Sequence, residues 1–140
     1  MTYEELRQAL SAADDKECGV GCTPDEVTEA ESALGVSFPA DYTRFLEDFG
    51  WLAIGSTEIF GLGKGVPDYL NVVRMTLAER RDTQPTIPSQ LVPVMNDGGG
   101  NLYCVDCEAT SDEVVIWDHT KGRVALRTGF ADWLASIIAA

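Results

Sequence analysis

One apolar helical stripe places the strongest constraint on the fold of this 140-residue chain. The stripe lies between Pro39 and Gly50, and its members follow the spacing i, i+3, i+4 and i+7: Tyr42, Phe45, Leu46 and Phe49. This spacing places four large side chains on one face of a helix. Such a helix is stable in water only when that face packs against another layer of the protein, so the chain must build a core around it.

Two further helices are predicted before this stripe. Thr2 and Glu5 have the spacing of a capping box, and the apolar residues that follow predict a helix over residues 3–13. A polar loop is expected over residues 14–22. A second helix begins at Pro24 after Thr23, because proline suits the first helical position, and ends before Gly35.

The second half of the chain has mostly the pattern of strands. Short strands are predicted at 51–54 and 57–60, and a helix within 68–81 that turns Leu70, Val73 and Leu77 inward. Segments rich in valine, isoleucine and aromatic residues predict four strands, at 91–95, 102–107, 113–118 and 123–127. An apolar stripe predicts a closing helix at 130–139. Helices, then strands, then a helix indicate an α+β fold, and no linker divides residues 1–140 into more than one domain.

The charge of the chain is strongly negative and unevenly distributed. The formal net charge is −13, and residues 1–50 alone hold 12 acids and 3 bases. Such a domain repels phosphate backbones, which argues against nucleic acid as a ligand and favours a basic partner. The alternative is that the charge only maintains solubility. Without a long apolar run or a basic, apolar leader, no membrane association is expected, and the cytoplasm is the expected location.

Two sequence features could indicate a cofactor or a metal site. The glycines at 98–100 lack the spacing of a phosphate-binding loop and lie between two strand-like segments, so a hairpin turn is favoured. Four cysteines, Cys18, Cys22, Cys104 and Cys107, could form a zinc site. However, Cys104 and Cys107 lie in a predicted strand and would point to opposite faces, which favours packed thiols. No cofactor and no metal are expected.

Catalytic chemistry is not favoured by the remaining polar residues. His119 follows a strand without any local signature of a nucleophile, and it is interpreted as a turn residue. In so acidic a chain, pairs of carboxylates are expected by chance, so they do not indicate a catalytic pair. Trp51, Trp117 and Trp133 lie in apolar stretches and are expected in the core, with Trp117, beside an acidic strand end, the best placed to be partly exposed.

Four segments, in order, resemble the signature of the SUKH superfamily, SMI/KNR type, over residues 23–138. They are Leu34-Gly35 with Phe38-Pro39 and Asp41-Tyr42, then Glu58 to Leu62, then Leu91 to Cys107 around the glycine turn, and Phe130 with Trp133-Leu134. Cys107 stands where a leucine is usual, which again favours a packed cysteine. The resemblance implies an α+β fold with a central, mostly antiparallel sheet.

The resemblance also implies a function without catalysis. Bacterial members of this superfamily are commonly immunity proteins that bind polymorphic toxins, often nucleases, and eukaryotic members are regulatory scaffolds. The expected function is therefore neutralisation of a basic protein toxin, and the alternative is a scaffold module without a toxin. Expected partner-binding residues are four that match recurrent polar positions of the family and one tryptophan: Glu58, Asp97, Asn101, Asp106 and Trp117. The sequence does not fix the oligomeric state.

Overall fold

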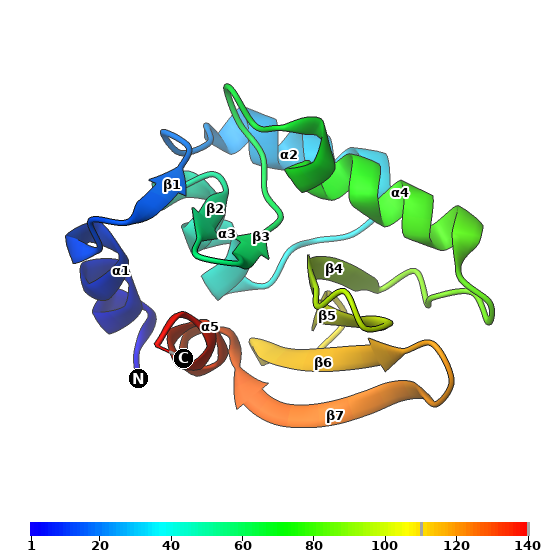
Figure 1. The fold of residues 1–140 in the computed structure, drawn as a ribbon. Coiled ribbons are helices and arrows are strands. Elements are labelled where there is room, and N and C mark those ends of the chain that lie inside the picture. Colours follow the sequence, from blue (N-terminus) through cyan, green and yellow to red (C-terminus); the bar gives the residue numbers. More distant parts are fainter. Residues whose placement is uncertain (110, 140) are drawn as a thin grey trace.

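A computed structural model describes residues 1–109 and 111–139. Within these residues the chain forms five α-helices, one 3-10 turn and two antiparallel sheets, so the predicted α+β class is confirmed (Figure 1). The helices are α1 (Tyr3–Ala12), α2 (Pro24–Leu34), α3 (Ala40–Asp48), α4 (Val72–Asp82) and α5 (Phe130–Ile138).

The first two helices begin as their sequences predict. The Thr2 hydroxyl accepts from the Glu5 N–H while the Glu5 carboxylate accepts from the Thr2 N–H, and Thr23 and Glu26 repeat this capping box at α2. Each box satisfies backbone donors that the first helical turn leaves without partners. Gly35 ends α2 with φ of 71°, a conformation that glycine adopts without a steric cost.

The smaller sheet contains a strand that the sequence did not reveal. Its order is β1 (Lys16–Cys18), β2 (Leu52–Ile54) and β3 (Thr57–Ile59). The expectation of a loop throughout 14–22 is therefore wrong at β1. Three residues of the type Lys-Glu-Cys carry no strand pattern of their own, and their conformation is fixed by pairing with β2.

The larger sheet is a four-stranded meander. Its strands, each adjacent to the next, are β4 (Leu91–Asn96), β5 (Asn101–Asp106), β6 (Glu113–Asp118) and β7 (Gly122–Gly129). The Phe60 N–H donates to the Val94 carbonyl at 2.8 Å, which joins the segment after β3 to β4. This link brings the ends of the two sheets together, although their residues are far apart in sequence.

The four-stranded sheet has a separate apolar cluster on each face. The larger cluster includes the α3 stripe, α5 and the inward residues Val105 and Val114, and the hydroxyl of fully buried Tyr42 donates to the Phe60 carbonyl at 2.7 Å. The opposite face holds a smaller cluster, in which Ile87 from the loop before β4 covers residues of the strands: Leu91, Leu102, Cys104, Val115 and Trp117. Because successive side chains of a strand point to opposite faces of the sheet, the same strands contribute residues to both cores.

The predicted inward face of the fourth helix is partly wrong. Leu70 is buried, but it belongs to the 3-10 turn Asp68–Leu70 that precedes α4. The helix itself begins at Val72 and buries Val72 and Thr76, whereas Leu77 is 44% exposed. Counting the helical period from Leu70 gave the wrong phase, because the 3-10 turn rotates each residue further than an α-helix does.

Candidate partner-binding site

Two of the five sequence-predicted residues meet at one cavity. Glu58 on β3 and Asp97 just after β4 are both exposed, and both line a hollow of about 250 Å³. The rest of its lining comes from the turn before β3, the end of β4 and α5: Ser56, Thr57, Met95, Asn96 and Ile137. The hydrogen bond between Phe60 and Val94 explains the meeting, since it sets β3 beside β4.

A second hollow continues the first. It has about 340 Å³, and it shares Ser56, Thr57 and Ile137 with its neighbour. Its other lining residues come from three parts of the chain: Asp15, Ile54, Gly55 and Ile138. We refer to the two hollows together as the acidic trough. It combines three carboxylates, Asp15, Glu58 and Asp97, with the apolar side chains of Ile54, Ile137 and Ile138 and the partly buried Met95.

The electrostatics of the acidic trough favour a cation. Among its described lining residues, none is basic. The C-terminal end of α5 also lies here through Ile137 and Ile138, and the carbonyls of a helix end carry a partial negative charge. The pKa of Asp97 is lowered, first by the hydrogen bond from the Gly99 N–H, so this carboxylate stays ionised at neutral pH.

The glycine turn 98–100 forms a hairpin connection, as expected. The Asp97 carboxylate accepts from the N–H groups of Gly99 at 2.7 Å and Asn101 at 3.2 Å, and the Asn96 side chain accepts from Gly98 at 2.8 Å. These backbone donors are therefore occupied by side chains of the same turn. Half-buried Asn101 lies against Asp97 through this turn, and it is absent from the lining of the trough.

The other two predicted residues are buried elsewhere in the fold. Trp117 is only 8% exposed and packs in the smaller core, as expected of a tryptophan in an apolar stretch, and its place beside an acidic strand end does not expose it. Its strand points it to the face that Ile87 covers. Asp106 is 6% exposed; its carboxylate contacts the Arg123 guanidinium at 2.7 Å and accepts from the Glu108 N–H at 3.0 Å. The structure thus gives Asp106 a role in fixing the turn after β5.

The cysteines and the histidine have structural surroundings. Cys104 packs in the smaller core and Cys107 against the larger one, so the two thiols do lie on opposite sides of the sheet. Among residues 1–109 and 111–139, no three of the His, Cys, Asp and Glu side chains gather as a metal site would need. His119 is exposed, and its Nδ1 lies 3.0 Å from the Gly100 carbonyl across the hairpin ends.

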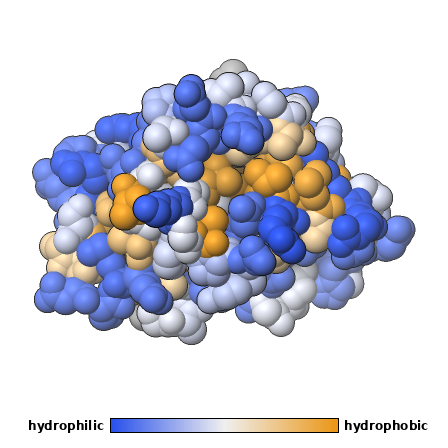
Figure 2. Space-filling view, turned by 90° about the horizontal axis from the view of Figure 1, so that it is seen from above, coloured by the Kyte–Doolittle hydropathy of each residue, from blue (hydrophilic) through white to orange (hydrophobic). Residues whose placement is uncertain are grey.

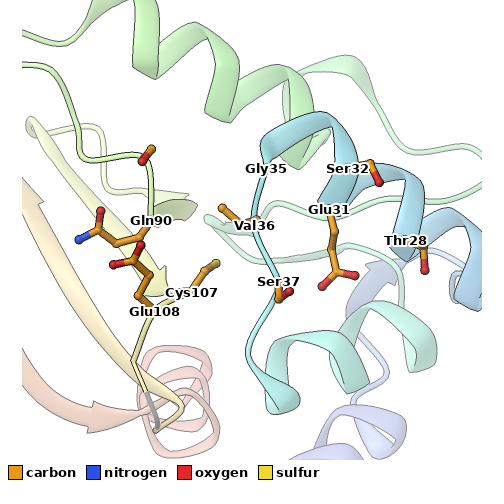
Figure 3. A pocket seen from close by; sticks show the side chains of 10 residues that line it. Thr28, Glu31, Ser32, Gly35, Val36, Ser37, Gln90, Cys107 and Glu108 are labelled. Carbon is orange, nitrogen blue, oxygen red and sulfur yellow. The ribbon is translucent and has the colours of Figure 1, made fainter.

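A larger cleft, which no sequence pattern indicated, lies between the helices and the sheet (Figure 3). It has about 550 Å³. Gln90, Cys107 and Glu108 form one wall, and the end of α2 with the segment after it forms the other, through Glu31, Val36 and Ser37. The Glu31 carboxylate accepts from the Phe38 N–H at 2.6 Å and so holds this segment in place. Burial, followed by the Asp106 charge, raises the pKa of Cys107 to about 12, which makes the thiol at this cleft a poor nucleophile.

Comparison with known families decides the affiliation. A family model described as SMI1-KNR4 cell-wall, of SUKH type, matches residues 3–139. The chain belongs to this family. The match includes α1, which lies outside the range of 23–138 over which the sequence resemblance was strongest. No curated protein matches the chain.

Membership of the SMI1-KNR4 family is consistent with a protein-binding role of the immunity type. The acidic trough, with an apolar part and a charged part, is suited to contact with another protein, because interfaces combine an apolar centre with a polar rim. In the described part of this SMI1-KNR4 chain, the helices are all too short or too polar to cross a bilayer.

Proposed function

We propose that this chain is a non-catalytic immunity protein that neutralises a basic, nuclease-type toxin by binding it through the acidic trough. The observation that carries the proposal is the position of Glu58 and Asp97 at one hollow beside Ile137. A lysine or arginine side chain has an apolar stem and a charged head, so it matches a cavity whose lining is apolar in one part and acidic in another.

The charge of the whole chain supports the same partner. A nuclease is basic where it holds nucleic acid, and a chain with a net charge of −13 is attracted to that surface. Occupation of the surface by the acidic trough would exclude the phosphates of the substrate. The proposal places the chain in the bacterial cytoplasm as a single domain, where its four cysteines remain as the free thiols seen in the structure.

The proposed function is tested with the toxin domain encoded beside this chain. Co-expression with the wild-type chain is expected to restore growth of cells that make the toxin. The double variant Glu58→Lys with Asp97→Lys is expected to weaken binding by about 100-fold or more and to abolish protection, because it reverses two charges at the contact. Calorimetry at low and high salt measures the affinity, and salt is expected to weaken it.

A matched control keeps the same change in net charge away from the trough. Asp25→Lys with Glu47→Lys changes two exposed acids on α2 and α3, and it is expected to lower the affinity by less than about 10-fold. Equal loss in both double variants would argue that only net charge matters. Weak binding to several host proteins, with no effect on the survival of cells that make the toxin, would instead favour the scaffold function.

A further inference from the structure

The face of the molecule formed by α2, α4 and the loop 62–69 carries an exposed apolar band. Figure 2 shows this band in orange across the middle of the face, with hydrophilic residues around it. Two hollows of about 380 and 470 Å³ lie here, and Arg74 lines both of them. The apolar lining residues come from α2, from the loop and from α4: Ala30, Ala33, Leu62, Val66, Tyr69, Val73, Met75, Leu77 and Ala78. We call this surface the α4 face.

Two large side chains on the α4 face are exposed without a covering element. Tyr69 is 60% exposed and Leu77 is 44% exposed. Contiguous apolar surface with charged residues at its border is typical of sites where proteins associate. Tyrosine, methionine and arginine are also the residue types enriched at such sites, and Tyr69, Met75 and Arg74 represent all three here.

The local charge of the α4 face differs from that of the rest of the chain. The two hollows of the α4 face are lined by two arginines, Arg74 and Arg81, and three acids, Glu26, Glu29 and Asp68, a local net of −1, whereas the whole chain has a net charge of −13. Two copies of so acidic a chain repel each other over most of their surfaces. The repulsion is small where positive and negative side chains nearly balance, as they do on the α4 face, so this face is suited to contact with a second copy.

We propose that two copies of this chain associate through their α4 faces with two-fold symmetry and antiparallel α4 helices. Asp68 lies before α4 and Arg81 near its end, roughly 20 Å apart at the rise of an α-helix. In an antiparallel pair, Asp68 of one copy lies opposite Arg81 of the other, and the symmetry makes this contact twice. Tyr69 and Leu77 are then buried between the helices.

The charged residues are free to make these contacts. Arg74 lies 3.7 Å from Asp68 and Arg81 lies 3.1 Å from Asp82, but all four side chains are at least 65% exposed, so these local pairs are weak and exchangeable. The α4 face shares no lining residue with the acidic trough. The dimer therefore does not depend on the proposed function, and it leaves both troughs open.

Sedimentation equilibrium of the full chain tests the dimer. The wild type is expected to show twice the monomer mass of 15.2 kDa at concentrations of about 100 µM. Leu77→Glu is expected to give the monomer mass, because it places a charge in the centre of the contact, while circular dichroism stays that of the wild type. Val20→Glu is the control, because Val20 is 83% exposed and lies outside the α4 face, and this variant is expected to remain a dimer.

A charge exchange tests the antiparallel arrangement. Asp68→Arg and Arg81→Asp are each expected to weaken the dimer about 10-fold, and the combined variant is expected to recover most of the loss. A wild type that remains at 15.2 kDa, or a Leu77→Glu variant that dimerises as the wild type does, would overturn the proposal. A dimer whose charge variants show no recovery would overturn the antiparallel arrangement.

Discussion

The guanidinium of Arg123 lies 2.7 Å from the carboxylate of Asp106, although β6 separates the strands that carry them. The Arg123 side chain is 45% exposed and that of Asp106 only 9%, so the arginine reaches from the surface to a buried acid. The same carboxylate accepts from the Glu108 N–H. This ion pair therefore ties the edge strand β7 to the turn that follows β5.

Loss of the arginine should destabilise the fold. Arg123→Met leaves the Asp106 carboxylate buried without its cation, and we expect the free energy of unfolding to fall by about 2 kcal/mol, less than for a fully buried pair. Urea unfolding at neutral pH measures the change. Addition of Asp106→Asn should recover more than half of it, because no buried charge remains. Lys121→Met, an exposed change next to β7, should alter stability by less than about 0.5 kcal/mol.

Removal of the Tyr42 hydroxyl should weaken the larger core. Tyr42→Phe keeps the aromatic packing but deprives the Phe60 carbonyl of a donor 2.7 Å away. We expect a loss of about 2 kcal/mol in the free energy of unfolding, because a buried acceptor then lacks this partner. Tyr69→Phe, at an exposed ring, should have almost no effect on the monomer. Similar small changes in both variants would show that the buried hydrogen bond contributes little.

The four thiols should differ in their reaction with a thiol reagent. Burial raises the pKa of Cys22 to about 11 and that of Cys107 to about 12, and Cys104 is completely buried. Cys18 is half-exposed. In the native chain at pH 8 we expect one thiol to react rapidly with Ellman's reagent, and all four to react in urea. Cys18→Ser should remove the rapid phase; rapid reaction of any remaining thiol in that variant would contradict the assignment.

Acid should remove the contribution of the Asp118 turn. The Thr120 hydroxyl and the N–H groups of Thr120 and Lys121 lower the pKa of Asp118 to about 2, from an ordinary value of 3.8. A lowered pKa in the folded state means that ionised Asp118 stabilises the fold above about pH 4, and that this contribution disappears as the pH falls toward 2.

Asp118→Asn should therefore lower the urea midpoint at pH 7, and the difference from the wild type should close between about pH 4 and pH 2. Asp14→Asn, in the loop after α1, is the control for removal of an exposed charge. A difference that stays constant with pH would show that the charge of Asp118 does not stabilise the turn.

Local signals were sufficient for the helical half of the fold. Thr2, Thr23 and Gly35 mark helix ends through contacts within a few residues, so their roles could be read from spacing. Strand β1 depends on β2, a partner far away in the chain, whereas the exposed position of Leu77 follows from the 3-10 turn that precedes α4. The degree to which Trp117 is buried also depends on distant residues, because the loop that holds Ile87 covers it.

The candidate site was predictable only in part. The resemblance to the family indicated Glu58 and Asp97, and the fold places them at one hollow. The contribution of Ile137 and of the end of α5 could not be inferred, since nothing in the spacing of these residues relates them to β3 or β4. Cavities form between segments that are distant in sequence, so a local sequence pattern does not reveal them.

The uneven distribution of charge also affects how this molecule would move near a partner. The acidic trough has three carboxylates and no base among its described lining residues, whereas α4 has an excess of one positive charge. A molecule with such a dipole experiences a torque in the field of a basic surface. It would rotate before contact so that the trough faces that surface, and a larger share of collisions would then be productive.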